Sequence, residues 1–170
     1  MDKSFKNEFL AAYESHADAI YRYCFFRVYS KERAEEFAQE TFLRAWEYSK
    51  GGKKIENMRA LLYRIARNLI IDHSRKKKEE SLETLSEETS FIEPSSDGRL
   101  VAEREMILKE VMEEMKNLGD EEREILTMRY VEDLDPKDIA EILGISANNV
   151  SVRINRAMKR LRESPRFRED

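Results

Sequence analysis

The residues of this chain best suited to contact a charged partner lie between Asp135 and Arg162, in the stretch DPKDIAEILGISANNVSVRINRAMKRLR. Asp135 is a suitable N-cap, and Pro136 takes the first helical position, where its missing N–H removes no hydrogen bond. Gly144 can adopt the left-handed conformation that ends a helix, and Ser146 can cap a second helix directly afterwards. The pattern predicts a helix-turn-helix, a motif whose second helix enters the major groove of DNA.

The second of these predicted helices has an apolar face and a polar face. Its apolar residues recur at helical spacing from Val150 to Leu161 and should face the interior. A helix that reads bases needs small polar residues at its leading end and cations behind them. The opposite face has this composition, since it consists of Asn148, Ser151, Val152, Asn155, Arg156 and Lys159.

Charge is unevenly distributed along the chain, so the formal net charge of −4 hides two basic regions. Residues 59–78 and 153–162 are rich in lysine and arginine, whereas residues 79–97 are rich in glutamate. The acidic stretch contains Pro94 and has no sustained apolar period. We therefore expect a flexible acidic linker at residues 79–99, which joins one domain at residues 1–78 to another at residues 100–170.

Helical signals fill both predicted domains. The chain has only 5 glycines and 39 % charged residues, and no long stretch alternates apolar with polar residues as a strand does. In the first domain Ser30 and Asn57 can each cap a helix. In the second domain an amphipathic segment surrounds Val111, and another runs from Asp120 to about Tyr130, whose ring should lie inside. The sequence predicts an all-α protein with an N-terminal helical bundle and a C-terminal four-helix domain.

Residues suited to catalysis or metal binding are scarce. His16, His73 and Cys24 are too few for a Cys/His metal cluster, and the cysteine lies in an apolar stretch that favours burial. No glycine-rich phosphate loop or nucleophile motif is present. No apolar run approaches the length of a membrane span, and a single cysteine suits a reducing cytoplasm. We expect no catalytic residue, metal, cofactor or small-molecule substrate, no membrane insertion, and a cytoplasmic location.

Three stretches together closely resemble the extracytoplasmic-function (ECF) sigma factors of bacterial RNA polymerase. They are EEFAQETFLRAW at residues 35–46, MRALLYRIARNLIIDHSRKKK at residues 58–78, and LGDEEREILTMRYVEDLDPKDIAEILGISANNVSVRINRAMKRLR at residues 118–162. The resemblance covers nearly the whole chain outside the linker, in family order. It implies a promoter-specificity subunit whose N-terminal domain binds the clamp helices of the polymerase core and the −10 element. The C-terminal domain would bind the −35 element and the polymerase flap, and an anti-sigma factor holds many members inactive.

The resemblance assigns the clamp contact to the outward face of the second helix in the N-terminal domain. An exposed polar face with fixed spacing suits a protein that must hold a coiled coil. The alternative is that this face is only a solvated surface. The residues concerned are Glu36, Gln39, Glu40 and Arg44.

Promoter melting requires a site for unstacked bases, with cations along the backbone and a pocket or platform for each extruded base. Family members commonly have Trp where this chain has Leu61, so melting here should depend more on Tyr63 and the lysine-rich loop before it. The alternative for Tyr63 is a place in the core. The residues expected at this site are Lys53, Lys54, Leu61, Tyr63, Arg64, Arg67 and Asn68.

In the recognition helix, the family positions that read bases coincide with the outward face identified above. Asn155 suits adenine, Arg156 suits guanine, and Val152 suits a thymine methyl group. Phosphate contacts set the register of a protein on DNA without reading its sequence. The side chains better placed for phosphates are Asn149, Arg153, Lys159 and Arg160.

Two further interpretations follow from the sequence. The acidic linker, with Glu83, Glu87, Glu88 and Glu93, is either a simple tether or a segment that replaces nucleic acid in a basic polymerase channel. The alternative function is a stand-alone helix-turn-helix regulator that binds duplex operator DNA. Such a regulator leaves residues 35–46 and 58–78 without an explanation.

Overall fold

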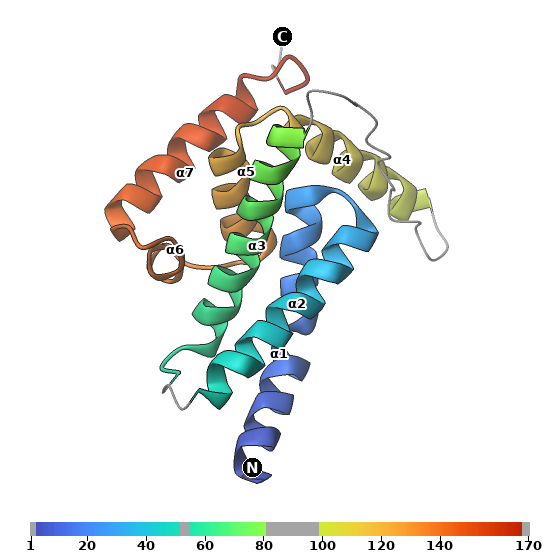
Figure 1. Cartoon of the computed structure of the whole chain (residues 1–170). Helices are drawn as coiled ribbons and strands as arrows, with labels where there is room; N and C mark the ends of the chain where they lie inside the picture. The colour runs from blue at the N-terminus through green and yellow to red at the C-terminus, as the bar shows by residue number, and fades with distance from the viewer. Residues whose placement is uncertain (1–2, 52–54, 81–98, 168–170) are drawn as a thin grey trace. The chain divides into compact units, whose positions relative to one another are not determined.

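The structure is a computed structural model that describes residues 3–51, 55–80 and 99–167. Every regular element in these ranges is a helix (Figure 1), so the prediction of an all-α protein is confirmed. The chain divides into two compact units, Met1–Ser90 and Phe91–Asp170. Residues 81–98 of the expected acidic linker, including its four named glutamates, lie outside the described residues.

The N-terminal unit is a bundle of α1 (Lys3–Val28), α2 (Lys31–Lys50) and α3 (Met58–Glu80), in which each helix contacts the other two. Small side chains such as Ala34 and Ala66 are fully buried and let the helices approach closely. Aromatic rings fill the remaining space, and the rings of Tyr13 and Phe42 meet edge to face with centroids 4.8 Å apart. Cys24 is buried in this core, as expected.

Both predicted caps of this unit are confirmed. Tyr29 ends α1 with a φ of 52°, and the hydroxyl of Ser30 then accepts a hydrogen bond from the Arg33 N–H at 3.4 Å. The side-chain oxygen of Asn57 accepts a hydrogen bond from the Ala60 N–H at 3.0 Å. Each cap satisfies one of the backbone donors that a helix start leaves without a partner.

The C-terminal unit contains α4 (Arg99–Lys116), α5 (Asp120–Leu126), the π-helical turn η1 (Thr127–Val131), α6 (Pro136–Leu143) and α7 (Ala147–Arg162). Both α5 and α6 pack on α7. The α7 side of this core consists of Val150, Ile154 and Ala157, which are all buried, while Leu161 is half-buried. The predicted buried stripe of the recognition helix is therefore confirmed along most of its length.

Tyr130 is the clear error of the sequence prediction, because its side chain is 59 % exposed and does not lie inside. The turn η1 is wound as a π-helix, and the Glu132 N–H donates to the Thr127 carbonyl at 3.0 Å. A π-helical turn holds more residues than an α-helical turn, so it rotates the following side chains away from the α-helical pattern. Met128 and Leu134 occupy the interior in place of Tyr130.

Candidate nucleic-acid interface

The helix-turn-helix forms by the capping interactions that its sequence predicts. One carboxylate oxygen of Asp135 accepts hydrogen bonds from the N–H groups of Lys137 and Asp138, both at 2.9 Å. Gly144 ends α6 in the left-handed conformation, with a φ of 68°. The hydroxyl of Ser146 accepts a hydrogen bond from the Asn149 N–H at 3.1 Å and starts α7. The turn between the two helices therefore has a defined path, which fixes the direction of α7.

The outward face of α7 brings together six of the predicted DNA-binding residues. They lie opposite the buried stripe that packs on α5 and α6, so the unit's own core leaves them accessible. Val152 is 39 % exposed and adds one apolar side chain to this polar face. The exposed residues of this face are Asn148, Ser151, Val152, Asn155, Arg156 and Lys159.

A second set of α7 side chains lies on the edge of the helix that faces α5. Arg153 donates to the side-chain oxygen of Asn149 at 3.1 Å and forms an ion pair of 3.6 Å with Glu121. Arg160, seven positions later, places one guanidinium nitrogen 2.7 and 2.9 Å from the two carboxylate oxygens of Glu122. These acids are far from α7 in the sequence, so residue spacing does not predict the contacts.

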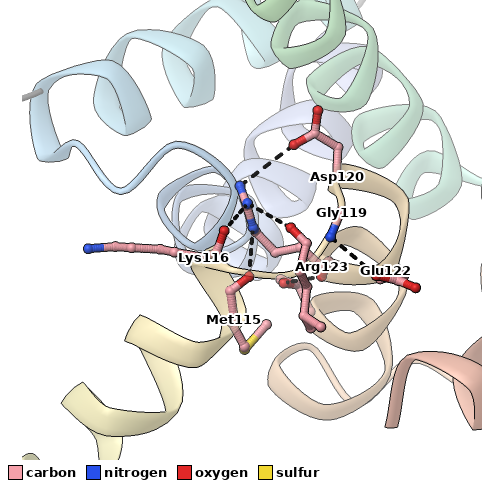
Figure 2. Close-up of polar contacts among 8 residues, drawn as sticks. Met115, Lys116, Gly119, Asp120, Glu122 and Arg123 are labelled. Carbon is pink, nitrogen blue, oxygen red and sulfur yellow. Dashed lines mark hydrogen bonds and ion pairs between the residues drawn. The ribbon is translucent and has the colours of Figure 1, made fainter. Parts of the chain in front are cut away.

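The junction between α4 and α5 is built around Arg123, another residue that the sequence analysis missed. Its guanidinium donates to the carbonyls of Met115, Lys116 and Leu118, at 3.1, 2.9 and 3.2 Å. Figure 2 shows this guanidinium among the carbonyls at the end of α4, with Asp120 on its other side. The last carbonyls of a helix have no partner within that helix, so a cation here stabilises the end of α4.

The outward face of α2 in the N-terminal unit contains the predicted clamp-contact residues. Glu36, Gln39 and Arg44 are exposed and Glu40 is half-exposed. The Arg44 guanidinium lies 2.6 Å from the Glu40 carboxylate. Leu43 lies among them and is 52 % exposed, although the sequence analysis gave it no role. The face therefore combines fixed charges with one exposed apolar side chain.

The residues predicted for base capture differ in how deeply their side chains are buried. Arg64 and Asn68 are exposed on α3, while Leu61 and Arg67 are half-buried. Tyr63 is only 2 % exposed, and its ring packs edge to face on Tyr23 with centroids 5.2 Å apart. Contact between the Tyr63 ring and a base would need that ring to leave the core.

Residues 52–54 of the lysine-rich loop before α3, including Lys53 and Lys54, lie outside the described residues. Lys50, at the end of α2, places its ammonium group 5.4 Å from the centre of the Trp46 ring. This distance is within the range of a cation–π interaction.

Other kinds of site find little support in the described part of the chain. There, no three side chains of His, Cys, Asp or Glu are grouped so that they could hold a metal ion. His16 is partly buried near Arg59, and burial, followed by the positive charge of that arginine, lowers the pKa of the imidazole. The described helices include none with the length and apolar character needed to cross a membrane.

Comparisons with known proteins agree with this arrangement. Residues 12–80 match Sigma-70 region 2, and residues 108–161 match Sigma-70, region 4. The ECF RNA polymerase sigma factor SigW of Bacillus subtilis is 30 % identical over 96 % of this chain and 92 % of its own length. The ECF RNA polymerase sigma factor SigL of Mycobacterium tuberculosis is 29 % identical over 89 % of this chain and 85 % of its own length.

A solved structure shares the fold. It is the sigma factor RpoE in complex with the anti-sigma factor NepR from Bartonella quintana, with a TM-score of 0.75 and 24 % identity. The similarity covers 95 % of this chain and 96 % of that one.

Proposed function

This chain belongs to the ECF sigma factors, which direct RNA polymerase to promoters, and from that premise we propose which of its surfaces perform each step. Sigma factors are initiation factors without enzymatic activity, so binding surfaces alone must account for the function. The observation that carries the proposal is the outward face of α7. It is polar, exposed and opposite a buried stripe, at the end of a capped helix-turn-helix.

The outward face of α7 reads the −35 element in the major groove. Asn155 can pair with adenine through two hydrogen bonds, Arg156 can pair with guanine in the same way, and Val152 can contact a thymine methyl group. Lys159 is exposed near the end of the helix and suits a phosphate. Asn148 and Ser151 lie on the leading turns, where small polar groups can approach base edges.

The outward face of α2 binds the clamp helices of the polymerase core. Glu36, Gln39, Glu40 and Arg44 supply polar contacts, and exposed Leu43 adds apolar area at the centre of the face. Interfaces derive much of their affinity from a few apolar or aromatic anchors within a polar rim. Substitution of Leu43 should therefore weaken core binding more than substitution of Glu36.

The −10 element is bound by α3 and the loop before it. The side chains of α3 best placed to contact the unpaired DNA strand are Arg64, Arg67 and Asn68, with Leu61 beside them. The loop contributes Lys53 and Lys54. Since Tyr63 is buried against Tyr23, we assign it the support of this surface and not the stacking of a base. The proposed partners are thus the polymerase core, through the clamp helices and flap, and promoter DNA.

The protein acts in the cytoplasm, where polymerase and chromosome are located, under control of an anti-sigma factor. The support for such a regulator is the complex of the similar sigma factor RpoE with NepR.

Two measurements test the proposal. The purified chain should co-elute with polymerase core, and the reconstituted holoenzyme should give run-off transcripts from specific start sites.

Asn155→Ala or Arg156→Gln should relax discrimination at one base pair of the −35 element by about 1–3 kcal/mol, without loss of core binding.

For the clamp surface, Leu43→Asp should reduce co-elution with core. Leu10→Asp, at a comparably exposed leucine of α1, is the matched control and should reduce it less. If the chain does not bind polymerase core but binds operator DNA by itself, it is a stand-alone regulator and the proposal is wrong.

A further inference from the structure

The cations of α7 fall into two groups with different surroundings. Arg156, Lys159 and Arg162 lie on the outward side of the helix, where all three side chains are exposed. Lys159 forms an ion pair of 3.8 Å with Glu163, but both side chains are well exposed, so water competes with this pair and it is weak. Arg153 and Arg160 lie on the edge toward α5 and contact the acidic first turn of that helix. A cation that is already neutralised by a carboxylate cannot neutralise a phosphate unless the first pair breaks.

Glu122 is held in place by more than Arg160. One of its carboxylate oxygens accepts a hydrogen bond from the Gly119 N–H at 3.2 Å, across the start of α5 (Figure 2). Its side chain is only 22 % exposed, whereas that of Arg160 is 66 % exposed. Arg123 in turn fixes α5 to the end of α4 through three carbonyls. The carboxylate is therefore already positioned, and Arg160 adapts to it.

Departure of Arg160 toward DNA would leave the Glu122 charge partly buried without its cation. Such a loss is more costly than the loss of an exposed pair, because the remaining charge keeps its desolvation penalty. The pair between Arg153 and Glu121 is longer and its carboxylate is more exposed, but the hydrogen bond from Arg153 to Asn149 holds the arginine on the same edge.

We propose that Glu121 and Glu122 keep Arg153 and Arg160 from DNA phosphates, so that only the outward face of α7 contributes cations to DNA binding. This inference rests on the proposed role of α7. It replaces the prediction that Arg153 and Arg160 contact phosphates. The two acids affect specificity indirectly, because they hold the arginines away from phosphates and so reduce the sequence-independent affinity for DNA. The base contacts of Asn155 and Arg156 then contribute a larger share of the binding free energy.

The test measures binding of the full chain to a labelled duplex of unrelated sequence, by fluorescence anisotropy at several salt concentrations. Glu122→Gln should release Arg160 and steepen the slope of log K against log salt by about 0.9, the value expected for one more phosphate contact. The affinity in 0.1 M salt should rise by roughly 5- to 10-fold. The double change of Glu121 and Glu122 to glutamine should steepen the slope by up to about twice as much.

Matched variants separate this effect from a change of net charge. Glu113→Gln removes one negative charge from α4, where the carboxylate pairs with Lys116 of the same helix. It should leave the slope unchanged. Arg160→Gln should also leave the slope unchanged in the wild-type chain, yet cancel the gain in the Glu122→Gln background. If Arg160→Gln alone flattens the slope by about 0.9, Arg160 contacts phosphate and the inference is wrong.

An unchanged slope in Glu122→Gln would also overturn the inference. The amide can still accept the Gly119 hydrogen bond, and helicity by circular dichroism checks that the variant folds. If it does not fold, the Arg160→Gln result decides alone. Lys159→Gln distinguishes this failure from failure of the proposed function: it should flatten the slope if α7 binds DNA, whatever the acids of α5 do.

Discussion

At the scale of single residues, the same amino-acid type has different roles according to its surroundings. Arg123 donates to three backbone carbonyls and forms an ion pair with Asp120 of its own unit, and its side chain is 15 % exposed. Arg156 is exposed and points away from the buried stripe of α7. The sequence alone shows two arginines in two helices. Only the contacts separate an arginine that stabilises the fold from one that can meet DNA.

Substitution of Arg123 should destabilise the C-terminal unit. Arg123→Ala removes three hydrogen bonds to the end of α4, so we expect a loss of about 2–4 kcal/mol in the free energy of unfolding. Urea unfolding followed by circular dichroism measures this loss. Arg156→Ala, on the exposed face, should change the same quantity by less than about 0.5 kcal/mol. Similar values for both variants would contradict the structural role of Arg123.

His16 should make the stability of the N-terminal unit depend on pH. Burial and the nearby Arg59 charge lower the pKa of this imidazole below its ordinary value of 6.5. The unfolded chain therefore binds the proton more readily, so stability falls as the pH decreases through 6.5 toward the lowered pKa. Between pH 7.5 and pH 5.5, the urea midpoint of the wild type should fall further than that of His16→Gln. Equal shifts would show that His16 makes no such contribution.

At the scale of the elements, the sequence predicted well what depends on neighbouring residues. The caps at Ser30, Asn57, Asp135 and Ser146 were identified because each makes its hydrogen bond within three residues. The winding of η1 was missed, since a π-helical turn has no comparable local signal, and Tyr130 was placed on the wrong side.

Contacts between distant parts of the chain were the other omission. Arg160 and Glu122 are 38 positions apart, so spacing could not join them. The burial of Tyr63 against Tyr23 likewise depends on how α3 packs on α1. For the outward face of α7, helical periodicity was enough to predict which side chains are exposed, because an outward face is the complement of a buried stripe.

Gly144 is the element-scale position where a small change should have a measurable effect. A β-carbon added here would have no neighbour within 4 Å, so the cost of Gly144→Ala comes from the left-handed backbone and not from a clash. We expect the free energy of unfolding to fall by about 1–2 kcal/mol. Gly144→Asn should lose less, since asparagine tolerates this conformation better. Equal losses in the two variants, measured by urea unfolding, would argue against a backbone origin.

At the scale of the whole molecule, the separate compact units explain why a sigma factor of this kind depends on its polymerase. Each unit has one proposed DNA-binding surface, and the chain as a whole has a net charge of −4. Two weak contacts give strong binding only when the geometry lets both sites engage together, and we propose that the polymerase core provides this geometry.

The free chain should therefore bind promoter DNA weakly. At physiological salt its affinity for a promoter duplex should be low, because each phosphate contact contributes a salt slope of only about −0.9 and the net charge of −4 opposes binding. The holoenzyme should prefer the promoter strongly. Anisotropy titrations with and without core test this, and tight, specific promoter binding by the free chain would contradict it.

The short connection between α6 and α7 also limits how the promoter preference of such a protein can evolve. Only Gly144, Ile145 and Ser146 separate the two helices. One extra residue in the first turn of α7 would rotate all later side chains by about 100° and take Ile154 and Ala157 out of the core. Insertions and deletions at this position are therefore not tolerated, because they disrupt the core. A lineage that acquires a new set of target genes must do so by exchanging side chains on an unchanged scaffold.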